Sequence, residues 1–119
     1  MIVESDAELG SNLSKRLVKM GSNVVPAHSA TEATSLLSDL AFIGCTLDAI
    51  LVAYRLRASR GDRILSEFRG EFPKAVLAMM LEAEDLAVSY WAKAKGIRIL
   101  QKPIRTRDLS AWAATIPLA

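Results

Sequence analysis

The chain has 119 residues, of which 51% are hydrophobic and 24% are charged, a composition that indicates one globular domain and excludes a disordered polypeptide. Its formal net charge of +2 is too small to indicate nucleic-acid binding by itself. The single cysteine excludes an internal disulfide, and no apolar run has the length of a membrane span, so we expect one cytoplasmic domain over residues 1–119.

Short apolar runs alternate along the chain with amphipathic stretches. The apolar runs, each expected to form a strand, cover residues 1–3, 24–27, 48–53, 75–80 and 97–100. The stretches with hydrophobic residues at helical spacing predict helices over residues 6–20, 29–40, 64–68, 84–95 and 106–114. Strict alternation of strands and helices with short connections predicts right-handed βαβ units and a parallel sheet.

Several residues mark the expected helix ends. Gly21 and Gly96 stand where a helix commonly ends on glycine. Ser29 followed by Glu32 matches a capping box, and Thr106 is the expected cap of the last helix. The segment 54–61 reads as a loop, and Cys45 as a small buried apolar residue.

Pieces of the sequence, taken in order and spacing, resemble one family. They are Ile2-Val3-Glu4, Gly21 before Val24-Val25, the run 48–52, Gly61, the run 75–79, and Gly96 with Lys102-Pro103. Together they resemble the receiver domain of bacterial response regulators over essentially the whole length. The resemblance implies a flavodoxin-like, doubly wound α/β fold: a five-stranded parallel sheet in the order 2-1-3-4-5 with five helices.

The resemblance also implies a phosphorylation site at the carboxyl ends of the strands, where the family holds Mg²⁺ on an acidic pair and phosphorylates an aspartate. Glu4 matches the first acid and Lys102 the lysine after the fifth strand. Ser5 stands where the second acid belongs, Ala53 at the phosphoacceptor, and Met80 at the Ser or Thr that ends the fourth strand. The site is therefore degenerate in its metal, acceptor and readout positions.

These replacements remove the family's chemistry. A methyl group at Ala53 is neither a nucleophile nor a metal ligand, and Glu4 with only the Ser5 hydroxyl makes a poor Mg²⁺ site. Asp48 lies at the opposite end of the same strand, and Asp62 is expected to begin a helix, so neither replaces the acceptor. We expect no metal, no cofactor and no enzymatic activity.

The predicted function is that of an atypical receiver in two-component signal transduction, acting through phosphorylation-independent protein–protein interaction. Its partner would be a histidine kinase, an effector domain or a second copy, and it would work alone or within a larger regulator or hybrid kinase. Two alternatives stay open: a phosphorelay receiver with a non-standard acceptor, and a flavodoxin-like domain that binds a small ligand. Nucleic acid and membrane are not expected as partners of this domain.

The remaining charges allow two interpretations each. Lys102 either keeps an anion contact or forms an ion pair with Glu4 that ties two strand ends, and we favour the ion pair. The positive rim formed by Arg55, Arg57, Arg60, Arg63, Arg105 and Arg107 is either an anion or acidic-partner site or a solvated surface.

Three aromatic residues are candidates for an interface. Tyr90 and Trp91 lie in the predicted fourth helix and Trp112 in the last. In the family, the face of the fourth helix, fifth strand and fifth helix commonly meets partners, so the resemblance implies a homodimer or partner contact there. The alternative is that Trp112 and one of the pair lie in the core, with the other partly exposed.

Overall fold

The computed structural model describes residues 1–117. Its centre is a five-stranded parallel sheet with the strand order β2-β1-β3-β6-β7. The strands are β1 (Ile2–Val3), β2 (Pro26–Ala27), β3 (Ala49–Ala53), β6 (Val76–Leu81) and β7 (Ile97–Gln101). Counted within this sheet alone, the order is 2-1-3-4-5, so the predicted flavodoxin-like fold class is confirmed.

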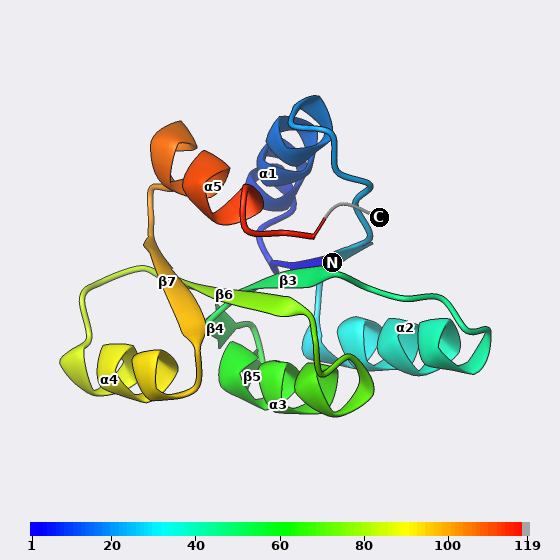
Figure 1. Cartoon of the computed structure of the whole chain (residues 1–119). Helices are drawn as coiled ribbons and strands as arrows, with labels where there is room; N and C mark the ends of the chain where they lie inside the picture. Colours follow the sequence, from blue (N-terminus) through cyan, green and yellow to red (C-terminus); the bar gives the residue numbers. More distant parts are fainter. Residues whose placement is uncertain (118–119) are drawn as a thin grey trace.

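Helices cover both faces of the sheet (Figure 1). On one face lie α1 (Ala7–Lys19) and α5 (Thr106–Ala113), and on the other lie α2 (Ala30–Phe42), α3 (Gly61–Glu71) and α4 (Leu86–Ala94). All five residues of β3 are buried, as expected for a strand with helices on both sides. This burial explains why the central strands read as continuous apolar runs rather than as alternating ones.

The helices begin in two ways. Side-chain oxygens of Asp6, Ser29 and Asp85 accept hydrogen bonds from the first free N–H groups of α1, α2 and α4. Arginines precede α3 and α5, at Arg60 and Arg105, and neither side chain caps its helix. These two helices therefore leave their first N–H groups without a side-chain partner.

The predicted cap of the last helix is wrong. Thr106 is already inside α5, and Arg105 occupies the cap position. The Thr106 hydroxyl lies 3.3 Å from a guanidinium nitrogen of Arg16, which also donates to the carbonyl of Ile104 at 3.0 Å. The hydroxyl is thus used to join α1 to the start of α5 rather than to cap its own helix.

The capping box of α2 is confirmed in half. The Ser29 hydroxyl accepts from the backbone N–H of Glu32 at 3.0 Å. The carboxylate of Glu32 reaches back one residue further than the motif requires and accepts from the N–H of His28 at 3.2 Å.

The segment expected to be a loop between the third strand and the next helix folds as a small hairpin. Its strands β4 (Arg55–Leu56) and β5 (Ser59–Arg60) pair antiparallel. The chain then returns to the sheet at Gly61, where a Cβ atom would lie 2.3 Å from the carbonyl oxygen of Ala53. Only glycine fits this approach, because a methyl group there would overlap the backbone.

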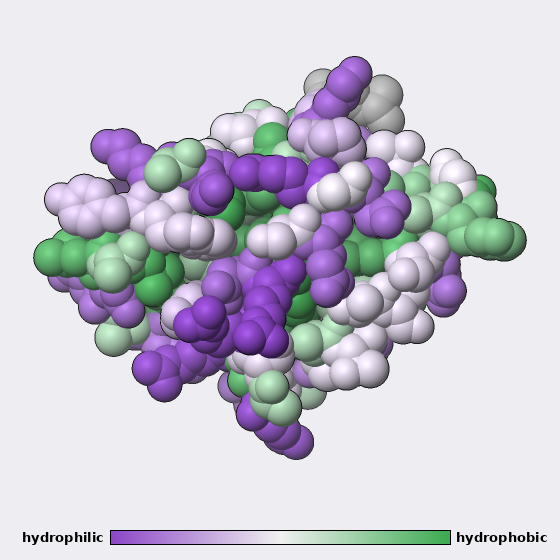
Figure 2. All heavy atoms as spheres, turned by 90° about the horizontal axis from the view of Figure 1, so that it is seen from below, coloured by the Kyte–Doolittle hydropathy of each residue, from purple (hydrophilic) through white to green (hydrophobic). Residues whose placement is uncertain are grey.

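The face of α2, α3 and α4 has polar side chains across its middle and apolar ones at both ends (Figure 2). At the end of α2, Phe42 is 92% exposed and Ile43 is 67% exposed. Cys45, expected to be buried, is exposed in the loop that follows. Gly44, with a φ of 77°, ends the helical segment, and residues 44–46 of the connection to β3 are all exposed. Among residues 1–117, no helix is long and apolar enough to cross a membrane.

Candidate functional site

The carboxyl ends of the parallel strands bring the predicted site residues to one edge of the sheet. Glu4 directly follows β1, Ala53 ends β3, and Lys102 directly follows β7. Ala53 lies opposite Met80 on β6, and the backbone N–H of Lys102 donates to the carbonyl of Leu81 at 2.8 Å. The five positions of the degenerate site therefore gather around the same edge, as the topology requires.

The centre of the site is an ion pair between Glu4 and Lys102. The ammonium nitrogen lies 2.5 Å from Oε1 of Glu4. Glu4 is 2% exposed and is the one charged residue in the buried set of the described chain. Its other oxygen lies 3.4 Å from the backbone N–H of Asp6. The expected pair that ties two strand ends is therefore present, and the carboxylate has its countercharge within the protein.

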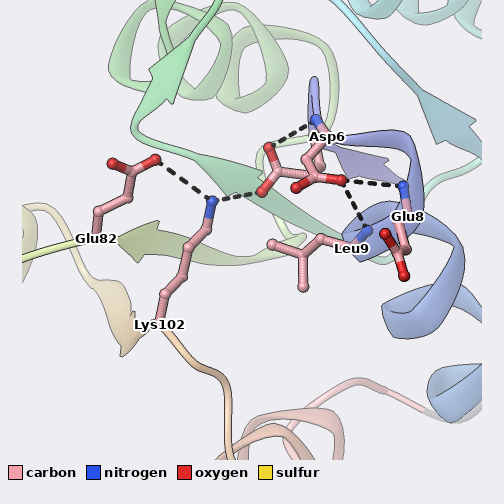
Figure 3. Close-up of polar contacts among 6 residues, drawn as sticks. Asp6, Glu8, Leu9, Glu82 and Lys102 are labelled. Carbon is pink, nitrogen blue, oxygen red and sulfur yellow. Dashed lines mark hydrogen bonds and ion pairs between the residues drawn. The ribbon is translucent and has the colours of Figure 1, made fainter.

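A second carboxylate approaches the ammonium group. Glu82, the first residue after β6, places Oε1 4.0 Å from the Lys102 nitrogen (Figure 3). We expected only Glu4 near Lys102, so Glu82 was missed. No pattern in the sequence marks it, because its role depends on a long side chain reaching across the neighbouring strand end. Its side chain is 62% exposed, so this outer contact is weaker than the inner one.

The acids around the site do not form a metal centre. Asp6 is the cap of α1: its Oδ1 accepts from the N–H groups of Glu8 and Leu9 at 3.0 and 3.1 Å. Ser5 is half-buried and adds only a hydroxyl. Within residues 1–117, no three His, Cys, Asp or Glu side chains are arranged to hold a metal ion.

The positions expected from the resemblance to hold the acceptor and the readout group contain only apolar side chains. Ala53 is 1% exposed and Met80 is 1% exposed. Strand β6 ends one residue later than predicted, so its last residue is Leu81 rather than Met80. Leu81 is also buried and has no hydroxyl. An apolar side chain therefore lies at the end of β6 whether Met80 or Leu81 is compared with the family's Ser or Thr.

The two other aspartates considered as acceptors lie elsewhere. Asp48 directly precedes β3, at the amino end of the strand. Asp62 lies in the first turn of α3 and pairs with Arg60 at 3.2 Å. Asp48 therefore lies at the start of a strand and Asp62 at the start of a helix, and neither lies at the carboxyl end of β3.

An open groove of about 640 Å³ lies beside the ion pair. Its walls come from the start of α1 and from the segment after β7, where the Lys102-Pro103 peptide bond is cis. The lining residues are Asp6, Leu9, Asn12, Arg16, Glu82, Lys102, Pro103 and Ile104. The groove thus combines apolar lining residues with charges of both signs.

The arginines of the predicted rim follow the carboxyl ends of two strands. Arg55, Arg57 and Arg60 lie on the β4–β5 hairpin after β3, and all three are exposed. Arg105 and Arg107 lie at the start of α5, after β7, and are also exposed. Strand β6 separates the two groups, so the positive rim is divided in two by the loop that follows β6.

The aromatic residues separate into core and surface. Tyr90 is 74% exposed on α4, and its neighbour Trp91 is half-buried against the core. Trp112 is 3% exposed, so it is a core residue, as the second interpretation had it, and is not available as a surface anchor. Of the three interface candidates, Tyr90 presents the largest free aromatic surface.

Solved structures of other proteins share this fold. A response regulator receiver domain protein from Clostridium thermocellum matches with a TM-score of 0.83 and 21% identity, over 95% of this chain and 88% of that one. The signal receiver domain of an HD domain-containing protein from Pseudomonas fluorescens Pf-5 gives 0.81 and 22%, over 97% and 90%. A structure described as adenylate cyclase from Rhodopirellula baltica gives 0.82 and 23%, over 95% and 82%. No protein-family model matches the sequence, and no curated protein matches it. The chain therefore has the receiver-type fold.

Proposed function

We propose that this chain is an atypical receiver domain of two-component signal transduction that acts through protein contacts without being phosphorylated. One observation carries the proposal: the ammonium group of Lys102 is bonded to the buried carboxylate of Glu4 beside the methyl group of Ala53. Phosphoryl transfer needs a nucleophile and cations free to offset the charge of the transferred group. Here the nucleophile is absent and the lysine is neutralised by a neighbouring acid.

The partner class follows from the same reasoning. A receiver fold without its own switch transmits information by binding, and its partner is a histidine kinase, an effector domain or a second copy in the cytoplasm. Two of the similar structures are described as an HD domain-containing protein and an adenylate cyclase, which supports an effector as partner. The exposed Tyr90 on α4 supports a contact on the face of α4, β7 and α5.

The test compares the chain with a variant that restores the missing acids. We expect beryllofluoride with Mg²⁺ to leave the amide NMR spectrum unchanged, and acetyl phosphate to leave the intact mass unchanged. The matched variant Ser5→Asp with Ala53→Asp regains two carboxylates, and we expect it to show a Mg²⁺-dependent change around Lys102. A stoichiometric, Mg²⁺-dependent response of the unaltered chain would overturn the proposal and favour a non-standard acceptor.

Binding of a small ligand is the second candidate function, and the groove between α1 and Lys102 favours it. Its mixture of apolar and oppositely charged lining residues suits a small molecule with both polar and apolar parts. Native mass spectrometry of the purified chain tests it: a bound molecule that disappears in an Asn12→Trp variant, which fills the groove, would support this function. A spectrum that shows only the chain without a ligand would contradict ligand binding, and protein contact would remain as the proposed function.

A further inference from the structure

The β4–β5 hairpin presents arginines on one side and anchors itself on the other. Leu56 is buried, whereas its chain neighbours Arg55 and Arg57 are exposed. Arg55 lies directly opposite Arg60 in the antiparallel pair, so the two share a face. Arg63 follows in the first turn of α3. We call Arg55, Arg57, Arg60 and Arg63 together the basic hairpin.

Most of this charge has no carboxylate partner among residues 1–117. Arg60 pairs with Asp62 at 3.2 Å and lies over the ring of Tyr54, 5.8 Å from its centroid. Across residues 1–117, no carboxylate lies within 4.0 Å of the other three arginines of the basic hairpin. Three guanidinium groups are therefore available to an outside ligand.

The arrangement disfavours folding in three ways. Like charges directly opposite each other, as at Arg55 and Arg60, destabilise a hairpin. Arg60 stands at the cap position of α3 without an acceptor for the free N–H groups. Arg63 adds a cation to the helix end that already carries a positive partial charge. All three raise the positive potential at one place, and departures of this kind from local stability rules are expected at functional sites.

We propose that the basic hairpin docks an extended, carboxylate-rich segment of a partner protein. The inference rests on the proposed function and names the surface and the partner class. A guanidinium group matches a carboxylate with two parallel hydrogen bonds. Arg55 lies in β4 and Arg57 in the turn that follows, and both are exposed, so an extended acidic peptide laid along the hairpin would meet both guanidinium groups.

The neighbouring loop argues against nucleic acid as the occupant. Strand β6 lies next to β3, and the loop after it carries Glu82, Glu84 and Asp85. A continuous phosphate backbone laid across the hairpin would be repelled by these carboxylates. A short acidic peptide needs only the basic hairpin itself.

Fluorescence anisotropy with a labelled decaglutamate peptide tests the inference on the whole 119-residue chain. We expect saturable binding that weakens with added salt, and a loss of at least tenfold in affinity for Arg55→Ala with Arg57→Ala. The matched control is Lys15→Ala with Lys74→Ala, which removes the same charge from exposed positions elsewhere and should keep the affinity within about twofold. Since Arg55→Ala removes a like-charge pair, the hairpin variant should melt no lower than the parent chain, which separates lost binding from lost folding.

Four outcomes would overturn the inference: no saturable binding of the peptide, an equal loss in the lysine control, equally tight binding of a DNA duplex, or a dimer of the chain that the hairpin variant abolishes. The proposed function fails separately. If the peptide does not bind while beryllofluoride still has no effect, only the docking surface is wrong. If the peptide binds only after acetyl phosphate and Mg²⁺ are added, phosphorylation independence is wrong.

Discussion

Helices α1, α2 and α4 begin at a side-chain oxygen that accepts from their free N–H groups, whereas α3 and α5 begin at an arginine that cannot. Four of the five helices directly follow a strand of the five-stranded sheet, and α3 follows the hairpin after β3, so all begin on the side of the carboxyl ends of the strands. The same fold thus gives the first N–H groups a side-chain acceptor at three helix starts and places a cation beside them at the other two. The difference is local, because α4, which has a cap, follows the strand that lies between those preceding α3 and α5, which have none.

The satisfied charges lie at the ends of β1 and β7. Glu4 precedes α1 and is paired with Lys102, and Asp6 caps the helix directly beside it. The unsatisfied charges lie one strand away, on the hairpin after β3. Removing a paired charge should therefore lower the free energy of unfolding. Removing an unpaired charge should change it little or raise it.

The largest expected effect is at the paired charges. Lys102→Met leaves the carboxylate of Glu4, which is 2% exposed, without its countercharge. Breaking one side of a buried ion pair costs about 3–5 kcal/mol, and we expect a loss of this size in the free energy of unfolding. Urea denaturation of parent and variant measures it.

The control removes both charges at once. Glu4→Gln with Lys102→Met leaves no buried ion, so the double variant should be more stable than Lys102→Met alone. A Lys102→Met protein as stable as the parent would show that the pair is solvated and that the two sets of charges do not differ.

A third kind of charge lies at the opposite edge of the sheet. The amino group of Met1 donates to the carbonyl of Ala49 at 2.8 Å. Burial lowers the pKa of this amine from 8.0 to about 6, against an opposing effect of the nearby Asp48 carboxylate. Between these values the unfolded chain binds a proton that the folded chain does not. The free energy of unfolding should therefore fall as the pH drops from 8 to 6, by at most ~3 kcal/mol.

Chemical denaturation at a series of pH values tests this dependence on the chain with a free Met1 amine. His28 is the one histidine of the chain, so His28→Gln is the control. The slope should persist in that variant. A slope that vanishes with His28 would assign the dependence to the imidazole and contradict the buried amine.

The sheet was predictable because strands that are buried on both faces consist of apolar residues. The run 49–53 is apolar throughout, and each of its residues is buried. The pair of Glu4 and Lys102 was predictable since both follow strands of one parallel sheet. The hairpin was not, because its residues 55–60 are mostly polar and its two strands are only two residues long each, too short for a periodic pattern. Glu82 and Thr106 were missed for a related reason: each depends on which distant side chain reaches it.

The next effect compares a capped helix start with an uncapped one directly. Asp85 accepts from the N–H of Val88 at 3.1 Å, so Asp85→Ala should cost about 1 kcal/mol. Arg105 makes no such bond, and Arg105→Ala should change the free energy of unfolding by less than about 0.5 kcal/mol. Thermal and urea unfolding of both variants measure the difference, and equal losses would contradict the division between the two kinds of helix start.

The smallest effect concerns the unsatisfied charge at α3, where a substitution should stabilise the protein. Arg63 lies in the first turn of the helix, close to its positive end. Arg63→Glu replaces an unfavourable charge with a favourable one there, so the free energy of unfolding should rise by about 0.3–1 kcal/mol in low salt and by less in high salt. Lys15→Glu, an exposed charge reversal in the middle of α1, is the control and should give no such gain. The same Arg63→Glu protein should bind the decaglutamate peptide more weakly, because the charge that disfavours the helix is one that the peptide would meet. If Arg63→Glu lowered the free energy of unfolding, Arg63 would be a residue that stabilises the fold. The arginines of the basic hairpin would then have to be grouped with the paired charges.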